Sequence, residues 1–406
     1  MISMVETLYR GSVKDVLGYV TVNSSSATAL KGLIFKYTDA YSVFDWGRMP
    51  DQIPYKRDAL AVIAADFFEK LENPEMWKSF SGSVVAYALR KACRHGSVFN
   101  ELGEELQTSG LRTHYIGVLE EIHGELGDKA TSVDVKSLSD IEKPVNLMAV
   151  RGVSIVRPAM STVLGKTLPD YRATVRSPLP RLVPLEVVFR FGCPPSSSLI
   201  ERAKADPVYI AELGLSDTKF EECKWDFPVM ELFTKLEQSD RVLRFSEALA
   251  ISGLSGEQLQ DIFLRTAWVA GFLKWACGKA GLELTDGKLE WAIGEDGKIF
   301  LVDAIGPDEL RLSRGGVQLS KEFLRAYYRD SAWFESVKKA KQRAREEGQL
   351  EWKQYVFEKP LPLSQDFKEA ASQLYISLAN ALCQRIWFRS VWSLDALAGK
   401  INMMRK

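Results

Sequence analysis

The chain has no long hydrophobic run and very little histidine, and each absence excludes a class of function. Its longest apolar stretches, such as 60–68, are too short and too interrupted to span a bilayer, so we expect no membrane partner. The 3 histidines are too few for a histidine-rich metal site or a histidine relay. Acids and bases appear within the first ten residues and no apolar segment follows them, so we expect no signal peptide.

The cysteine content and the net charge also limit the location and the kinds of partner that we expect. The 5 cysteines show neither metal-ligand spacing nor an even disulfide framework, which favours reduced thiols and a cytoplasmic location. Basic and acidic residues number 53 each, so nothing points to a nucleic-acid partner. A chain of 406 residues can bury a large core and form two lobes. The sequence leaves homo-oligomerisation open.

The most informative stretch is a predicted β-hairpin whose two strands flank the polar turn Gly294–Gly297. If this turn is a four-residue loop, Ile293 pairs with Lys298. Counting back along both strands then places Lys288 opposite Asp303.

Alternation along the first strand puts Asp286, Lys288 and Glu290 on one face, and Asp303 joins them from the second strand. Ionic groups on the core face of a sheet are costly unless they are paired or bind a metal. Two carboxylates, with water and phosphate completing the shell, suit Mg²⁺. A solvated face with a Lys288–Asp303 cross-strand pair explains the same alternation, and both interpretations stay open at this point.

Two other segments carry candidate binding residues. Near the N-terminus, Gly11, Ser12 and Lys14 lie between two strand-like runs, where glycine allows a close backbone approach and lysine can neutralise phosphate. An ordinary hairpin is the simpler interpretation of this pattern. Further on, Glu186 and Arg190 interrupt an otherwise apolar strand, and charged residues in a buried strand should be partnered or functional.

The remaining pattern is mainly helical. The serine-rich loop that follows the apolar strand contains Ser197 and Ser198 and can open a helix that suits an anion. The region 158–180 has no clear periodicity and is predicted as a long loop or lid. Helices are predicted over Arg57–Leu71, Ser83–Leu106, Ser255–Gly281, Ser320–Glu347 and Ser364–Ser390.

Seven blocks along residues 8–312 resemble, in order, those of SAICAR synthetase, the ATP-dependent amide ligase of purine synthesis. They are LYRGSVKDV, TDAYSVFD, QIPYK, GLRTHY, VPLEVVFR, FTKLEQSD and the hairpin pattern D-x-K-x-E followed by D-x-x-x-P-D-x-x-R-L. No block is specific alone, but the ordered set is. The chain departs from the family pattern where Ser12 replaces a lysine, Tyr55 replaces a glycine and Ser239 replaces a histidine.

The resemblance implies an α+β fold with two lobes, with ATP bound between the lobes and with extra helices. Three regions follow: 1–156 as the N-terminal lobe with a helical insertion, 157–318 as the catalytic lobe, and 319–406 as a helical extension. It implies catalytic roles for Lys14, Lys235, Asp240 and Lys288. It implies ATP contacts at Gly11, Ser12, Lys14, Glu290 and Asp303, the last two holding Mg²⁺. It implies substrate contacts at Asp39, Ser42, Lys56, Glu186, Arg190, Ser197, Ser198, Asp308 and Arg311.

The activity implied is activation of an imidazole-ribotide carboxylate as an acyl phosphate, followed by attack of an amino-acid amine such as that of aspartate. Three alternatives remain. The chain can be a paralogue with another carboxylate or amine, because the departures lie mainly on the substrate side. It can be a small-molecule kinase on the same fold, or a non-catalytic nucleotide-binding protein, although buried acids argue against the last.

Overall fold

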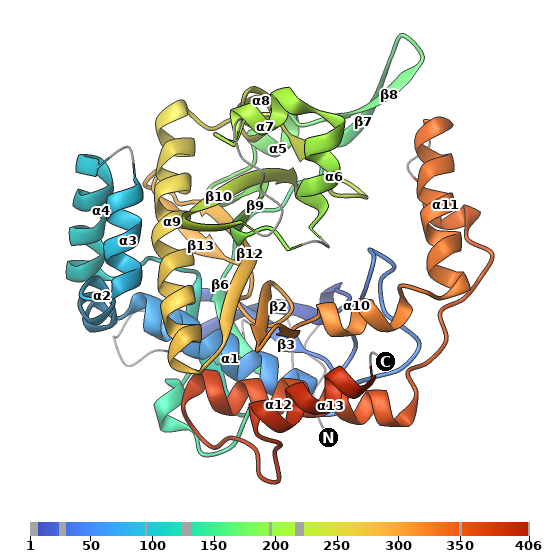
Figure 1. Ribbon diagram of the computed structural model, residues 1–406. Coiled ribbons are helices and arrows are strands. Elements are labelled where there is room, and N and C mark those ends of the chain that lie inside the picture. The colour runs from blue at the N-terminus through green and yellow to red at the C-terminus, as the bar shows by residue number, and fades with distance from the viewer. Residues whose placement is uncertain are drawn as a thin grey trace.

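A computed structural model describes residues 7–23, 30–93, 96–122, 131–194, 197–215, 223–348 and 351–404. Two large sheets form the centre of the molecule and helices surround them (Figure 1). Across these residues, no helix combines the length and the apolar character that crossing a membrane requires.

The N-terminal lobe contains a six-stranded sheet in the order β1-β2-β3-β6-β4, with β5 pairing with β2. Its strands are β1 (Thr7–Arg10), β2 (Lys14–Asn23), β3 (Leu30–Tyr37), β4 (Tyr115–Leu119), β5 (Thr131–Asp134) and β6 (Leu147–Arg151). The pairs along the main path are antiparallel, whereas β5 runs parallel to β2. The first residue of β2 is Lys14, so this sheet delivers one of the predicted site residues.

The C-terminal lobe contains a seven-stranded antiparallel sheet in the order β11-β10-β9-β12-β14-β15, with β13 pairing with β12. Its strands are β9 (Arg181–Gly192), β10 (Lys224–Thr234), β11 (Val242–Leu243), β12 (Glu283–Ile293), β13 (Ile299–Val302), β14 (Leu310–Arg314) and β15 (Val317–Gln318). Strand β9 is buried along nearly its whole length. Glu186 and Arg190 therefore lie in a buried strand, as the sequence predicted.

Helix α9 (Gly256–Lys279) connects the C-terminal sheet to a group of helices inserted in the N-terminal lobe (Figure 1). The inserted helices are α2 (Pro74–Ser81), α3 (Val84–Ala92) and α4 (Gly96–Ser109). The predicted capping box is present, since Ser255 and Gln258 each accept the other's backbone N–H. Trp268 of α9 stacks on Phe99 of α4 with ring centroids 4.5 Å apart and donates its Nε1–H to the Phe99 carbonyl at 2.9 Å. The insertion is thus part of the core.

The C-terminal helices are also packed into the molecule. Helix α1 (Lys56–Glu72) lies against α12 (Gln365–Cys383), while α11 (Ala332–Glu346) stands apart on the other side of the molecule (Figure 1). The hydroxyl of Tyr375 in α12 donates to Asp308 at 2.7 Å, which ties this helix to the segment after β13. The other helical elements are α5 (Arg172–Val175), α6 (Ser198–Ala205), α7 (Pro207–Glu212), α8 (Phe245–Ser252), α10 (Glu322–Tyr328), α13 (Leu394–Met404), and the 3₁₀ turns η1 (Leu138–Asp140) and η2 (Trp352–Tyr355).

Several predicted boundaries are wrong. The helix predicted over Ser83–Leu106 is two helices, α3 and α4, and the helix predicted over Ser320–Glu347 is α10 followed by α11. In the second case Ser331 starts a new helix by accepting the backbone N–H of Phe334. The predicted loop 158–180 contains a hairpin of β7 (Ala159–Val163) and β8 (Lys166–Asp170). Its strands were missed because most of their side chains are exposed, so no hydrophobic alternation marks them.

The register of the signature hairpin also differs from the prediction by one residue. Ile293 pairs with Ile299, not Lys298, so the connection is longer than the four-residue loop. In this register Asp303 would point to the wrong face if the strand continued. The strand ends at Val302 instead, and Asp303 adopts a left-handed backbone with φ 71°. This change of backbone direction returns the Asp303 side chain to Lys288.

Gly110, which follows α4, has both a left-handed backbone and no room for a side chain, whereas Gly297 has the left-handed backbone alone. Gly110 has φ +71°, and a Cβ there would lie 2.0 Å from the backbone oxygen of Glu72. Gly297 has a similar φ of +75°, but a Cβ would meet nothing within 4 Å. Gly297→Ala should therefore cost only the left-handed backbone penalty of about 1–2 kcal/mol. Gly110→Ala should lower the thermal unfolding midpoint clearly further, and an equal or smaller shift would contradict the packing described here.

Candidate functional site

A large cleft with a volume of about 1370 Å³ lies between the two sheets. Its walls include residues from β2, β3, β9, β12, the segment after β13, and α10. Fourteen basic and ten acidic side chains line it, although the whole chain is neutral. A surplus of positive charge in a cleft attracts anionic ligands.

A first charged group in the cleft brings together strands β9 and β12. Glu290 is 3% exposed, and its cross-strand partner is Glu186. Lys288 contacts both carboxylates, with 2.8 Å to Glu186, and Lys235 lies 2.9 Å from Glu186 and 2.6 Å from Glu290. Two lysines thus neutralise two carboxylates that would otherwise repel each other, as buried charges require.

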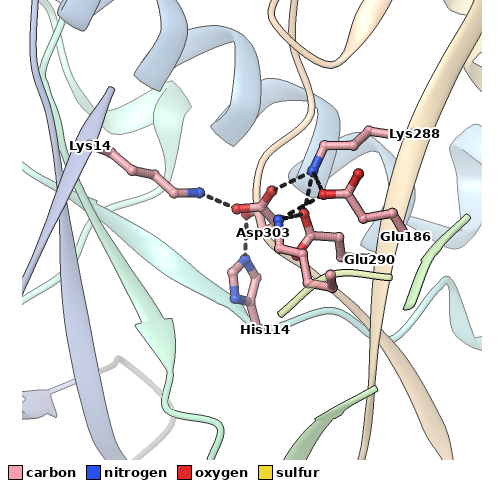
Figure 2. Close-up of polar contacts among 7 residues, drawn as sticks. Lys14, His114, Glu186, Lys288, Glu290 and Asp303 are labelled. Carbon is pink, nitrogen blue, oxygen red and sulfur yellow. Dashed lines mark hydrogen bonds and ion pairs between the residues drawn. The ribbon is translucent and has the colours of Figure 1, made fainter. Parts of the chain in front are cut away.

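Asp303 connects this group to the N-terminal lobe, as Figure 2 shows. Its carboxylate forms an ion pair with Lys14 of β2 and lies 3.6 Å from the Lys288 ammonium. The His114 ring, packed between Phe35 and Phe68, donates its Nε2–H to the Asp303 carbonyl at 2.9 Å. This bond supports the left-handed backbone of Asp303, a conformation that surrounding structure must stabilise.

The lysines determine the protonation of the carboxylates. Burial alone would raise the pKa of Glu186, but Lys288 and Lys235 outweigh it and lower this pKa to about 2. Burial is likewise outweighed at Asp303, where Lys14, Lys288 and Lys235 hold the pKa well below its usual range. At Glu290, burial and the nearby Asp303 charge raise the pKa. Burial and the charge of Lys14 lower the pKa of His114 to about 3, so this ring is neutral.

A second charged group lies beside the first and is built around arginines. Arg190 donates to Glu231 at 2.6 Å and lies 3.9 Å from Asp286. Arg311 pairs with Asp286 at 2.7 Å and lies 3.7 Å from Glu322 of α10. Arg190 is almost fully buried, whereas the Arg311 side chain keeps 19% exposure toward the cleft. Arg311 is therefore better placed to meet a ligand, with Arg190 behind it.

Most of the predicted site residues line this one cleft. These are Gly11, Ser12, Lys14, Ser42, Glu186, Arg190, Ser198, Lys235, Asp240, Lys288, Glu290, Asp303, Asp308 and Arg311. Gly11 is required by the tight turn, because a Cβ there would lie 2.3 Å from the Lys14 carbonyl oxygen. Its own N–H donates to that oxygen and so is occupied within the turn.

Three predicted residues lie outside the lining, and each has a structural partner. The Asp39 carboxylate accepts the backbone N–H of Arg57 at the start of α1, and Ser197 caps α6. Lys56 is fully buried and pairs with Asp308 at 3.0 Å. Asp308 belongs to the same contact, since its side chain is only 4% exposed and faces Lys56 and Tyr375.

The sequence did not single out several residues that complete the site. Glu231 is fully buried and accepts from Arg190, Arg202 and Tyr209. An acid within the apolar strand β10 was the available signal, the same signal that identified Glu186. Glu322 and His114 gave no such signal alone, because their roles arise from contacts between distant segments.

Comparison with known proteins agrees with this geometry. The family model for SAICAR synthetase matches residues 7–340, which is most of the chain. The chain belongs to the SAICAR synthetase family. A provisionally named phosphoribosylaminoimidazole-succinocarboxamide synthase of Archaeoglobus fulgidus is 33% identical over 380 residues, covering 93% of this chain and 95% of that protein. A synthase of the same name from Thermoplasma acidophilum is 31% identical over 214 residues, 51% of this chain and 69% of that protein.

A solved SAICAR synthase structure covers 97% of this chain and 100% of its own, with a TM-score of 0.50 and 17% identity. This likeness concerns the fold alone and confirms the predicted two-lobe α+β class. The general function of SAICAR synthetases is that of an ATP-dependent ligase joining a carboxylate to aspartate. A cleft rich in basic groups between two lobes is compatible with such anionic ligands.

The shifted pKa of Glu186 predicts how stability depends on pH. Because this pKa is about 2 in the folded chain against an ordinary 4.5, the stabilisation is complete above about pH 4.5 and is lost as pH falls through about 2. Glu186→Gln should be less stable than the parent at pH 5, by a few kcal/mol at most, and the difference should narrow toward pH 2. Urea midpoints measured at several pH values test this. A difference that stays constant would show that the Glu186 charge does not interact with the lysines.

Proposed function

We propose that the chain is a carboxylate–amine ligase that activates an imidazole-ribotide carboxylate as an acyl phosphate and joins it to the amine of aspartate. The observation that supports this most directly is the cluster of Lys14, Lys235 and Lys288 around Glu186, Glu290 and Asp303 in a net basic cleft. Membership in the family and the order of its sequence blocks supply the reaction class.

A carboxylate is a poor electrophile, because its negative charge repels nucleophiles and it lacks a good leaving group. Transfer of a phosphoryl group removes both obstacles, and the protein then contributes positioning and charge neutralisation. In this proposal Lys14 and Lys288 neutralise ATP phosphates from the two lobes. Arg311 and Ser198 face the anionic ribotide, and arginine suits that role because its planar fork matches anionic oxygens.

Glu290 and Asp303 are the residues we propose to hold Mg²⁺. Among the described residues, no group of three or more acidic, cysteine or histidine side chains is arranged to hold a metal. Two carboxylates with phosphate and water oxygens are nevertheless a common Mg²⁺ environment, so the donor set fits this ion. Bound there, Mg²⁺ would supply charge neutralisation for phosphate oxygens. Lys235, which contacts Glu290 and Glu186, and Asp240, which lines the cleft, would help to organise the metal and the transferred phosphoryl group.

The decisive assay supplies ATP, carboxyaminoimidazole ribotide and aspartate and measures ADP, orthophosphate and amide. We expect equal amounts of all three products and no turnover when any substrate is omitted. Amide formation only with another carboxylate or amine would establish the paralogue function. ADP formation without amine and without orthophosphate would contradict the ligase and indicate a kinase.

Lys14 offers a specific test of the proposed ATP site. Lys14→Met should raise the KM for ATP or lower kcat by about tenfold or more, because a lost charged hydrogen bond costs about 1.5–3 kcal/mol. Lys36→Met is the matched control, since Lys36 is exposed on the neighbouring strand and does not line the cleft. Identical ATP dependence in the two variants would remove Lys14 from the site.

Glu290 tests the proposed metal site. Glu290→Gln keeps the shape of the side chain but removes a charge from the partners of Lys235 and Lys288, so the unfolding midpoint should fall. At temperatures where the variant is still fully folded, turnover should nevertheless fall by at least a hundredfold. Glu295→Gln, in the exposed hairpin turn, controls for the loss of one acid. When Mg²⁺ is titrated, the turnover rate should depend on its concentration more weakly in Glu290→Gln than in the parent. Glu295→Gln should show the dependence of the parent. Full activity of Glu290→Gln at ordinary Mg²⁺ would rule out this assignment.

A further inference from the structure

Glu309 is a carboxylate in the cleft that the roles above leave unused. Its backbone is well fixed, since its N–H donates to Gly306 at 3.0 Å and its carbonyl accepts from Lys288 at 3.2 Å. Within the described part of the chain, its carboxylate has neither a hydrogen bond nor an ion pair, unlike Asp303 and Asp308. A half-buried carboxylate without a partner is costly in a folded chain unless a ligand contacts it.

Tyr37 is a second unpartnered group on the same cleft. It is 2% exposed, and its hydroxyl finds no hydrogen-bond partner among the described residues. Burial, with the negative charges of Glu309 and Asp303, raises the pKa of Tyr37, so the hydroxyl keeps its proton. Tyr37, Glu309 and Asp303 all line this cleft. An unsatisfied buried hydroxyl costs about 1–3 kcal/mol, which a ligand group could recover.

The surroundings of Glu309 favour proton exchange near neutral pH. Burial and the charges of Asp308 and Asp303 raise the pKa of Glu309 to about 8, and the ammonium groups of Lys288 and Lys14 oppose this rise. The titratable and charged groups around it come from β2, β3, β12, the segment after β13, the start of α10 and α12. They are Lys14, Tyr37, Lys288, Asp303, Asp308, Lys321 and Tyr375. A carboxyl group of this kind suits a general base.

We propose that Glu309 and Tyr37 form the amine-binding site of the cleft, in which Glu309 accepts a proton from the attacking ammonium and Tyr37 orients it. This inference rests on the proposed ligase function and adds to it the residue that activates the nucleophile. An amino-acid amine is protonated at neutral pH and cannot attack a carbonyl until it loses a proton.

The step balances in protons and electrons. The ammonium gives one proton to the Glu309 carboxylate, and the freed nitrogen lone pair forms the C–N bond to the acyl phosphate. The C–O bond to phosphate breaks, and its electron pair leaves with the phosphate. The second nitrogen proton passes to that phosphate, giving hydrogen phosphate and the neutral amide. Glu309 then returns its proton to water.

The test compares amines of different basicity. Glu309→Gln should lower kcat/KM for aspartate at pH 7 by at least a hundredfold while the KM for ATP stays unchanged, because general-base catalysis typically contributes 10²–10⁴. With hydroxylamine, which is largely unprotonated at pH 7, the variant should approach parent activity. Tyr37→Phe should reduce kcat/KM for aspartate by about tenfold. Glu295→Gln is again the charge control.

The pH profile supplies an independent readout. For the parent, kcat/KM for aspartate should rise with pH and level off above about 8, because the base must be ionised. For Glu309→Gln it should instead follow the fraction of unprotonated amine and keep rising. Parent-like activity of Glu309→Gln with aspartate, or equal impairment with both amines, would overturn the inference. Failure of the parent to form an amide would overturn the proposed function itself.

Discussion

Three lysines and three carboxylates neutralise one another where the two lobes meet. The carboxylates are Glu186, Glu290 and Asp303, and each is held by at least two of Lys14, Lys235 and Lys288. The six come from both sheets, so their balance requires strands far apart in the sequence to be correctly placed. Loss of any one leaves an uncompensated buried charge, which is far more costly than loss of the whole group.

This balance has consequences for chemistry. The cluster is already neutral, so a polyanionic nucleotide can bind only if further positive charge accompanies it. The surplus of basic groups along the cleft supplies part of that charge, and a divalent ion on the carboxylates would supply more. Asp303 links the two lobes, because its carboxylate faces lysines of both lobes and its backbone carbonyl accepts a hydrogen bond from His114.

The local sequence pattern was sufficient to predict those parts of the site that lie on a single strand. Alternation alone put Asp286, Lys288 and Glu290 on one face, and the structure shows them there. The register of the hairpin depends on the length of its turn, and alternation does not determine that length. The predicted register is therefore wrong by one residue. Asp303 reaches its predicted neighbour only through a left-handed backbone, which no periodicity reveals. Glu322 was missed because its partner in the site is contributed by another element, whereas Glu231 was missed although an acid in the apolar strand β10 marked it.

A match to a family block does not show whether a residue contacts the ligand or supports its neighbours, as the contacts around α12 illustrate. Lys56 and Asp308 match family blocks, yet their charges are satisfied by each other and by Tyr375 of α12. Helix α12 packs on α1 and so supports the segment that runs from Asp303 to Arg311. Residues predicted from motifs to contact substrate can therefore act by holding those that do.

We propose that this charged cluster serves transfer of a phosphoryl group to a carboxylate. The most direct measurement uses a substrate whose carboxylate oxygens are ¹⁸O and follows the label by ³¹P NMR of the released orthophosphate. If an acyl phosphate forms, one ¹⁸O atom should appear in orthophosphate for each amide made. Orthophosphate without label, or label that stays entirely in the organic product, would contradict the account.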